Sequence, residues 1–209
     1  PIENMAPGPA RPFSVSEAHT SFPYLFRFEE RTYMIPEICA AGHVSIFESK
    51  GFPTAWEPVR TILSNVDAAD SACFQYRDRW WLITSLKSPD SGGFYRYLGV
   101  YHTDNPLTGE WVRHPVTDSC LYMGRSKETG RNAGYIENGP AGLLRPKQES
   151  AAYYGEGMNI MRVKTLTPSR FEEEECPPPA HLKDIVGRPG VHHATRLGDF
   201  VTWDERKRK

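Results

Sequence analysis

The sequence predicts an all-β fold, and within that class a β-propeller, from three observations. A pattern of polar lead-in, apolar strand, short polar turn and second strand occurs four times, starting at residues 19, 67, 132 and 191. The chain contains 17 Gly, 18 Pro and 12% aromatic residues, which favours turn-rich sheet over a helical bundle. A repeat of about 40–50 residues that supplies about four short strands is typical of a propeller blade. An ordinary sandwich of hairpins is the alternative.

Each repeat contains a hairpin whose turn residues fit a tight connection. The first, at 19–37, has YLFRF and RTYMI as strands around EE, and the second, at 67–85, has ACFQY and RWWLI around RD. The third, at 132–149, turns at ENGP, and the fourth, at 191–205, turns at GD. Because side chains alternate along a strand, Trp80 and Trp81 are expected to face opposite sides and to pack in the core.

Three segments between the hairpins are also predicted to be extended: VSIFES at 44–49, YLGVYHTD at 97–104 and GMNIMRVKTLT at 157–167. RFEEEE at 170–175 looks superficially helical, but PPP at 177–179 prevents a helix from continuing. We therefore expect a loop or a single turn at 170–175.

A length of 209 residues predicts one domain with a sizeable core. Residues 1–17 are Pro-rich without an apolar period and predict an extended arm, 18–204 form the propeller domain, and ERKRK at 205–209 is a basic tail. The formal net charge of −1 gives no electrostatic footprint for nucleic acid. No stretch approaches about 18 consecutive apolar residues, so no membrane span is predicted.

The cysteines and the short motifs give no indication of a metal or cofactor. Cys39, Cys73, Cys120 and Cys176 are far apart and form no CxxC pair, so a zinc site is not expected. Each lies in or beside an apolar stretch, which suits buried free thiols, although disulfide pairing stays open. HxH, HExxH, GxSxG and P-loop patterns do not occur.

Several segments follow one another in the order of a known family: HTSFPYLF with YMIPE, FPTAWEP, DAADSACF with RWWLITS, YHTDNPLTGEWVRHP, and LLRPKQE with YYGEGMNIMRVKTLTPSRFEE. The most specific motifs are YMIPE, and RPxQ followed by YG. From about residue 18 to 203 the chain resembles the propeller-type domain at the N-terminal side of glucosamine inositolphosphorylceramide transferases and in many bacterial stand-alone relatives. That domain is similar to the five-bladed propellers of the arabinanase, invertase and levansucrase glycosidases, so the resemblance implies a five-bladed fold.

The sequence departs from the family pattern in two places. No Ala-Asp-Pro-Phe strand start precedes residue 18, so the first blade is expected to be incomplete or missing, or the ring to be completed by the arm or by a second subunit. A homo-oligomer is one arrangement that would complete it. Asp-Pro-Thr is replaced by Asp70-Ser71-Ala72, and Gln-Asp by Gln148-Glu149, and both replacements retain a carboxylate.

The innermost strand of each propeller blade lines a central channel. The lead-ins of the four repeats are therefore expected to face a common funnel, where they would bind the hydroxyl groups of a sugar: His19, Asp70, Asn132 and His193. Because His192 and His193 point to opposite faces of a strand, at most one of them is expected to reach the channel.

Glycoside hydrolysis needs two carboxyl groups that face one bond. Asp70 is the first candidate, as base, nucleophile or stabiliser of the acid. Glu37 ends YMIPE, where Pro36 ends the strand. Glu149 closes RPKQE directly after Gln148 and matches an acidic position of the family. Gln148 is expected to bind the substrate beside these acids.

Two arginines, Arg131 and Arg145, could hold a carboxylate or phosphate group through two hydrogen bonds. Structural roles are the alternatives for several of these residues. Asp70 could cap a turn through its side chain, Glu37 could be a surface charge at a strand end, and Arg145 with Glu149 could form an internal ion pair.

These features predict a protein that takes a glycan or another small molecule and has no resident metal or cofactor. The leading interpretation is hydrolysis or transfer of a glycosyl group with Asp70, Glu37 and Glu149 as the acids. One alternative is a non-catalytic glycan-binding module that assists a partner transferase. Another is an enzyme of different chemistry, such as a cyclase or isomerase, that reuses the funnel. The sequence leaves open whether the protein is catalytic.

Overall fold

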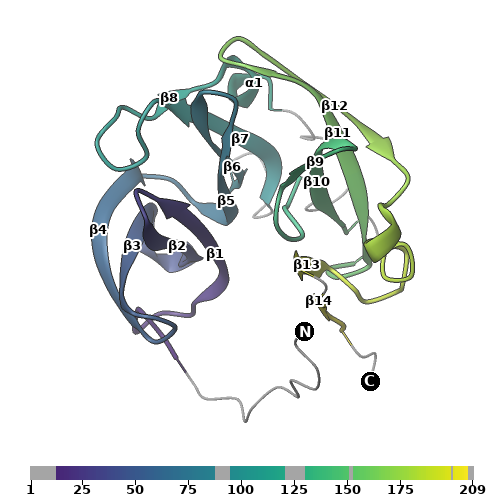
Figure 1. Ribbon diagram of the computed structural model, residues 1–209, viewed down its shortest axis with the longest axis horizontal. Coiled ribbons are helices and arrows are strands. Elements are labelled where there is room, and N and C mark those ends of the chain that lie inside the picture. The colour runs from purple at the N-terminus through teal and green to yellow at the C-terminus, as the bar shows by residue number, and fades with distance from the viewer. Residues whose placement is uncertain (1–12, 88–94, 121–129, 151–152, 199, 207–209) are drawn as a thin grey trace.

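The computed structural model describes residues 13–87, 95–120, 130–150, 153–198 and 200–206, which are nearly all sheet. Three four-stranded antiparallel sheets and one two-stranded sheet surround a common centre in a propeller-like arrangement (Figure 1). The first sheet has the order β1 (Ser21–Phe28), β2 (Arg31–Glu37), β3 (His43–Gly51), β4 (Ala55–Ser64). The second has the order β5 (Ala68–Tyr76), β6 (Arg79–Lys87), β7 (Tyr95–Thr103), β8 (Val112–Arg113).

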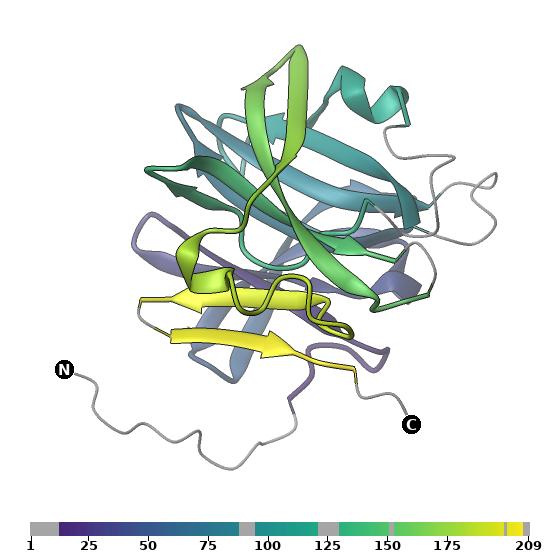
Figure 2. The ribbon, with the colours of Figure 1, turned by 90° about the vertical axis from the view of Figure 1, so that its right-hand side faces the viewer.

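The third sheet contains β9 (Glu137–Gly139), β10 (Gly142–Glu149), β11 (Gly157–Thr167) and β12 (Arg170–Cys176). The fourth is a hairpin of β13 (His193–Leu197) and β14 (Phe200–Asp204), which runs beside the third sheet (Figure 2). In each sheet the first strand along the chain lies nearest the centre (Figure 1). All four predicted hairpins are therefore present, and the ends of their inner strands meet at the middle of the molecule.

Turn chemistry explains the hairpins locally. Glu29 and Glu30, between β1 and β2, have φ values of 46° and 61°, the left-handed backbone of a two-residue turn that matches strand twist. In the third sheet β9 includes Glu137–Gly139, so the turn lies at 140–141 rather than across ENGP as predicted. The strand extends further because residues 137 and 138 pair with β10.

The prediction of a loop or helical turn at 170–175 is wrong, because this segment is strand β12 at the outer edge of the third sheet. Its side chains alternate: Phe171 is buried, and Glu173 forms a buried ion pair with Arg145. Glu172 and Glu174 are exposed and pair with Arg170 and Lys164. Glutamates that look helical by composition are thus accommodated as a charged edge strand, a common protection against edge-to-edge pairing.

Apolar side chains fill the spaces between neighbouring sheets in three clusters. One cluster lies between the first and second sheets and includes Trp80, and another, between the second and third, includes Trp81. The two tryptophans thus pack on opposite faces of β6 as expected. The third cluster joins the third sheet to β13 through residues such as Met158 and Ala194.

The remaining features are short. Helix α1 (Pro115–Asp118) and the 3-10 turns η1 (Cys39–Ala41) and η3 (Ala180–Leu182) connect strands. All four cysteines are thiols outside any disulfide. Cys73 alone is buried, whereas the other three are half-buried, contrary to expectation. Within the described part of the chain, no helix has the length and apolar character to cross a bilayer. Most of the predicted arm and the end of the basic tail lie outside the described residues.

Candidate functional site

The inner strands of the first and second sheets begin with the same irregularity. The register of β1 shifts between Ser21 and Tyr24, and that of β5 shifts between Ala69 and Ala72. Each bulge contains a residue with left-handed backbone, Phe22 at φ 43° and Asp70 at φ 50°. A bulge redirects a side chain, and both of these residues line the same central cavity.

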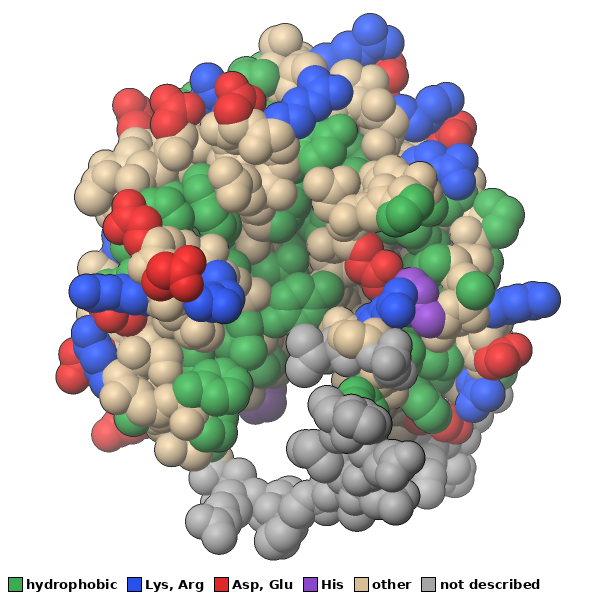
Figure 3. Space-filling model, in the orientation of Figure 1, with side chains coloured by type: hydrophobic (Ala, Val, Ile, Leu, Met, Phe, Trp, Pro, Cys, Tyr) green, Lys and Arg blue, Asp and Glu red, His purple; other side chains and the backbone are tan. Residues whose placement is uncertain are grey.

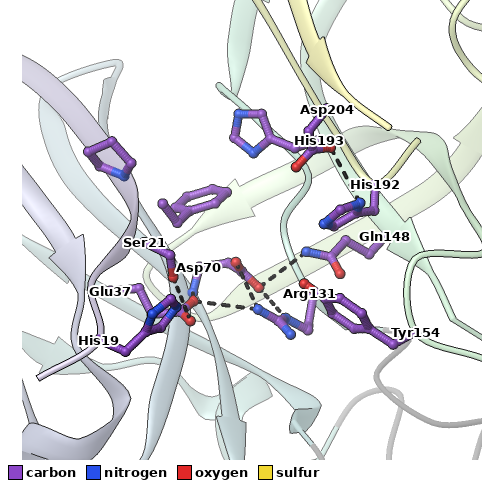
Figure 4. Close-up of a pocket in the computed structure, with 12 residues that line it drawn as sticks. His19, Ser21, Glu37, Asp70, Arg131, Gln148, Tyr154, His192, His193 and Asp204 are labelled. Atoms are coloured by element: carbon purple, nitrogen blue, oxygen red, sulfur yellow. Dashed lines mark hydrogen bonds and ion pairs between the residues drawn. The ribbon is translucent and has the colours of Figure 1, made fainter. Parts of the chain in front are cut away.

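This cavity has a volume of about 390 Å³, within the range of about 300–1,000 Å³ that is usual for small-molecule sites. All four sheets contribute to it, and Figure 4 shows carboxylate, guanidinium, amide and imidazole side chains pointing towards one another from these sheets. The cavity lies where the inner strands begin, and Figure 3 shows the molecule from the opposite end, where Lys, Arg, Asp and Glu side chains are spread around the ring. Its lining consists of His19, Ser21, Phe22, Pro23, Glu37, Asp70, Arg131, Gln148, Tyr154, His192, His193 and Asp204.

Asp70 is the most heavily bonded of the lining residues. It is 3% exposed. Its carboxylate accepts hydrogen bonds from Nε of Arg131, from Nη2 of Arg131 at 3.1 Å and from Nε2 of Gln148 at 3.5 Å. Its backbone carbonyl accepts from Nδ2 of Asn132 at 2.7 Å. The side chain is therefore held in one orientation by groups from the segment before β9 and from β10.

Glu37 brings a second carboxylate to the same place. It is the last residue of β2, and Oε2 accepts the backbone N–H of Asp70 at 2.7 Å. Ser21 Oγ and Cys39 Sγ donate to Oε1 at 3.1 and 3.3 Å. Arg131 Nη2 lies 3.5 Å from Oε2, so one guanidinium is shared by two carboxylates (Figure 4).

Burial determines the protonation chemistry of this cluster. Desolvation raises the pKa of Asp70 to about 7, with Arg131 opposing the rise and Glu37 adding to it. Burial lowers the pKa of Arg131, but the two carboxylates outweigh this effect and raise it above the usual value. Burial also lowers the pKa of His193, which favours its neutral form. At neutral pH Asp70 can both hold and release a proton, as acid–base chemistry requires.

The rim of the cavity is aromatic and basic. Phe22 packs against the edge of His193 with ring centroids 5.1 Å apart. Tyr154 is 44% exposed; its ring lies 5.4 Å from the Arg131 guanidinium and 5.2 Å from the His192 ring. Exposed rings beside polar groups are suited to contacts with apolar ligand faces.

The prediction that at most one of His192 and His193 reaches the centre is wrong, because both line the cavity. Strand β13 begins at His193, so His192 precedes the strand and does not follow its alternation. His192 Nδ1 lies 3.3 Å from Asp204 Oδ1, which places the end of β14 at the rim.

Gln148 has one satisfied and one unsatisfied end. It is 2% exposed, and Nε2 donates to the backbone carbonyl of Asn132 at 3.1 Å as well as to Asp70. Its carbonyl Oε1 is buried and has no hydrogen-bond partner among the residues that the structure describes. A buried acceptor without a partner costs about 1–3 kcal/mol, so it marks a place where a ligand or water would be stabilised.

Six of the nine residues predicted for the site line this cavity: Glu37, Asp70, His19, Arg131, Gln148 and His193. The other three lie outside its lining. Asn132 is fully buried and links the sheets, donating to the carbonyls of Asp70 and Ile83. Glu149 is half-buried, 3.3 Å from Asn159 Nδ2, and its catalytic role stays a prediction.

Arg145 is also fully buried and forms two hydrogen bonds to Glu173, at 2.8 and 2.5 Å. The alternative predicted an internal ion pair between Arg145 and Glu149. Arg145 does form an internal ion pair, but its partner is Glu173. Glu173 was hidden from sequence reasoning because its segment was not expected to be a strand.

Sequence reasoning missed Phe22, Tyr154 and Asp204 as lining residues. Phe22 could have been found by aligning the repeats at the strand start, where SFPY of the first corresponds to ADSA of the second. His19 was chosen instead as the lead-in, and it is exposed. Asp204 carries no local signal, because its position depends on the pairing of β13 with β14.

The donor set favours organic ligands. Within the described ranges, no three His, Cys, Asp or Glu side chains are grouped as metal ligands. Carboxylates, an amide, imidazoles and a guanidinium can bind hydroxyl groups, and the two aromatic rings can contact an apolar face.

Comparisons of the sequence with known proteins give consistent matches. The model of the family "Glucosamine inositolphosphorylceramide transferase 1, N-terminal" matches residues 14–186. Proteins named glucosamine inositolphosphorylceramide transferase 1 are 26% identical over 155 residues in Oryza sativa subsp. japonica and over 159 residues in Arabidopsis thaliana. These matches cover 74% and 76% of this chain but 20% of each relative, so the chain spans about a fifth of their length.

Solved structures of similar fold are glycoside hydrolases. An exo-β-1,3-galactanase from Clostridium thermocellum gives a TM-score of 0.53 at 10% identity, covering 74% of this chain and 34% of that one. A thermostable family-43 glycoside hydrolase gives 0.51 at 13% identity, covering 78% and 55%. At these identities the likeness concerns the fold.

Proposed function

Because the chain belongs to the family of the N-terminal part of glucosamine inositolphosphorylceramide transferase 1, we propose that it binds a glycan in its central cavity. One observation carries this proposal: a cavity of about 390 Å³ combines buried, fixed polar groups with two partly exposed aromatic rings. Sugars present hydroxyl groups to the first kind of group and the faces of their rings to the second.

The polar floor is organised before any ligand arrives. Arg131 holds both Asp70 and Glu37, and Gln148 donates to the same Asp70 oxygen, Oδ2, that accepts from Arg131 Nε. A network whose members bind one another has little rotamer freedom left to lose on binding. The floor therefore supports recognition of one orientation of a sugar, and Phe22 and Tyr154 supply the apolar contacts.

Hydrolysis or transfer of a glycosyl group is the second candidate. The pKa of Asp70, raised by burial to about 7, favours it, because a glycosidase needs one carboxyl that can donate a proton near neutrality. The contacts of the two carboxylates favour binding alone. Asp70 and Glu37 are both engaged by one guanidinium, that of Arg131, whereas glycoside hydrolysis needs two carboxyl groups that face the scissile bond.

We also propose that the four sheets are blades of a five-bladed ring in which the β13–β14 hairpin is part of one blade. The resemblance to the arabinanase-type propellers supports this number. Completion of the ring by a second copy remains a prediction, and the measured mass of the protein in solution would test it.

The first experiment is a binding screen of the wild-type protein with mono- and oligosaccharides by ligand-observed NMR, alongside release of aryl groups from aryl glycosides. Tyr154→Ala should weaken binding severalfold, since its ring is exposed at the cavity. Phe52→Ala, which removes an aromatic ring that is 64% exposed outside the lining, is the matched control.

Binding without turnover supports a glycan-binding module. Turnover that disappears in both Asp70→Asn and Glu37→Gln supports the hydrolase. If no sugar binds at millimolar concentration and no aryl glycoside is cleaved, the proposed function is wrong.

A further inference from the structure

A second, smaller cavity adjoins the central one at the start of β1. Its volume is about 110 Å³, and its described lining consists of Phe13, Val15, Thr20, Ser21, Pro23, Met34 and Pro36. Two of these residues, Ser21 and Pro23, also line the central cavity. The two cavities are therefore neighbours that share part of one wall, and we call the smaller one the side cavity.

The bulge in β1 accounts for the shared wall. Phe22 has left-handed backbone, with φ at 43°, and it lies where the register of β1 shifts. Its ring lines the central cavity and contacts His193. Ser21 and Pro23, the residues on either side of it, lie at the border with the side cavity. Ser21 Oγ also donates to Glu37 Oε1 at 3.1 Å (Figure 4), so this border is attached to the polar floor of the central cavity.

The segment that precedes β1 supplies one wall of the side cavity. Ser14 Oγ lies 3.3 Å from Thr20 Oγ1, a contact that brings the two ends of this segment together. Phe13 and Val15 thereby line the same cavity as two buried residues of β2. Because Phe13 is 43% exposed, the side cavity reaches the surface of the molecule on this side.

The two cavities differ in chemistry. Carboxylates, imidazoles, an amide and a guanidinium line the central one. Among the described residues of the side cavity there is no charged side chain, and five of the seven are apolar. The two hydroxyl groups in that lining already have partners, Ser21 with Glu37 and Thr20 with Ser14. Water gains few hydrogen bonds from such a lining, whereas an apolar group that enters it is removed from water.

We infer that the side cavity is a subsite for a compact apolar substituent of the glycan, so that the preferred ligand is a glycoside whose sugar lies in the central cavity. A group attached to the sugar beside Ser21 and Pro23 meets the side cavity directly, because these two residues line both cavities. This inference rests on the proposed glycan binding and adds the chemistry of the group that the sugar carries.

The volume of the side cavity limits the substituent to about the size of one ring. An apolar cavity of about 150 Å³ is large enough to hold benzene, and the side cavity has about 110 Å³ with an exposed side at Phe13. A phenyl group therefore matches the space, whereas most of a long alkyl chain would stay outside the lining and in water.

Isothermal titration of the wild-type protein tests the inference with methyl, phenyl and octyl thioglycosides of D-glucose, D-galactose and D-xylose, the octyl compounds below their micellar concentrations. The sulfur linkage resists hydrolysis, so binding is measured without turnover. For a sugar that binds, the phenyl compound should bind about tenfold more tightly than the methyl compound, because more apolar surface leaves water. This gain should come with a more negative heat-capacity change, and the octyl compound should bind no more tightly than the phenyl compound.

Two exposed phenylalanines provide a matched pair of variants. Phe13→Ala removes a ring that is 43% exposed and lines the side cavity, and Phe200→Ala removes a ring that is 45% exposed outside the lining of both cavities. Phe13→Ala should reduce the preference for phenyl over methyl about threefold by removing part of the apolar wall, and Phe200→Ala should leave it unchanged. Val15→Trp places a large side chain in the side cavity, so it should weaken binding of the phenyl compound and not that of the methyl compound.

The outcomes separate the subsite from the proposed function. Equal affinity for the methyl and phenyl compounds, or a phenyl preference that neither Phe13→Ala nor Val15→Trp reduces, would overturn the subsite and leave glycan binding intact. Binding of free saccharides but of no glycoside would do the same.

Two further results would assign the side cavity to a different occupant. Affinity that rises from phenyl to octyl would mean a groove for long chains in place of a compact subsite. A mass in solution that falls from dimer to monomer in Phe13→Ala would mean that this face is covered by a second copy of the chain. Absence of binding by every glycoside and every free saccharide would overturn the proposed function, and the subsite with it.

Discussion

The inner strands of the first and second sheets begin with the same backbone irregularity, a β-bulge, but the side chains at the two bulges differ in chemistry. Both strands have a bulge within their first few residues, and both place a non-glycine residue in the left-handed region, Phe22 in one and Asp70 in the other. One side chain is an apolar ring at the rim and the other a buried carboxylate at the floor. The bulge therefore sets where a side chain points, and residue type sets what the cavity can bind.

The two side chains are also supported differently. Phe22 is half-buried and rests on the rings of Tyr24 and His193. Asp70 is enclosed by charged and polar partners from segments 33 to 78 residues away along the chain. The Phe22 ring is held by packing and the Asp70 carboxylate by an ion pair. The same substitution should therefore change the free energy of unfolding by different amounts at the two positions.

The largest effect is expected from Asp70→Ala, which leaves Arg131 buried with only part of its compensating charge. Removing one member of a buried pair costs about 3–5 kcal/mol, so the free energy of unfolding in urea should fall by that order. Asp70→Asn should lose less, because it keeps the shape and part of the hydrogen bonding.

Arg145→Leu is the matched lesion outside the cavity, since Arg145 is fully buried against Glu173. It should cost a similar free energy of unfolding and leave sugar affinity unchanged, whereas Asp70→Asn should weaken sugar binding. If both variants lose sugar binding at a temperature where both are folded, sugar binding does not depend specifically on the Asp70–Arg131 pair.

The next effect is a dependence of stability on pH. The pKa of Asp70 is about 7 in the folded protein and about 3.8 in the unfolded chain, so the folded state binds more protons between these values. Stability should therefore fall as pH rises from about 4 to about 7, by up to about 1.4 kcal/mol per pH unit from this group, and level off above.

Urea titrations at several pH values give this slope, and the difference between wild type and Asp70→Asn isolates the contribution of Asp70. A slope of the opposite sign in that difference would mean that Arg131 outweighs burial and that the carboxyl is ionised throughout.

The smallest effect comes from backbone strain at Phe22. Both Phe22→Ala and Phe22→Gly lose the contacts of the ring, but glycine adopts a φ of 43° without strain, whereas alanine adopts it at a cost in free energy. Phe22→Gly should therefore be more stable than Phe22→Ala by about 1 kcal/mol. The pair Asp70→Gly and Asp70→Ala should show a difference of the same sign, and a reversed order at either position would mean that the bulge is not retained.

Sequence reasoning succeeded where local chemistry decides structure. The turns at Glu29–Glu30 and around Arg77 were located from short charged pairs between two apolar runs, and both turns have left-handed backbone in the structure. Alternation along β6 placed Trp80 and Trp81 on opposite faces. It failed at 170–175, where a run of glutamates forms an edge strand because one of them, Glu173, has a buried arginine to pair with. No sequence pattern within residues 170–175 indicates that Arg145 is the partner.

The sequence by itself determined the hairpins, their order and most of the polar residues that gather at the centre, because turns and strand periodicity depend on neighbours along the chain. Only the tertiary structure decided that Arg131 joins Asp70, 61 residues away, and Glu37, 94 residues away. It also decided that burial raises the pKa of Asp70 and that both His192 and His193 reach the cavity. Such contacts, and the loss of water around them, arise only when the sheets pack together. They join residues far apart along the chain, so the sequence of any one segment does not indicate them.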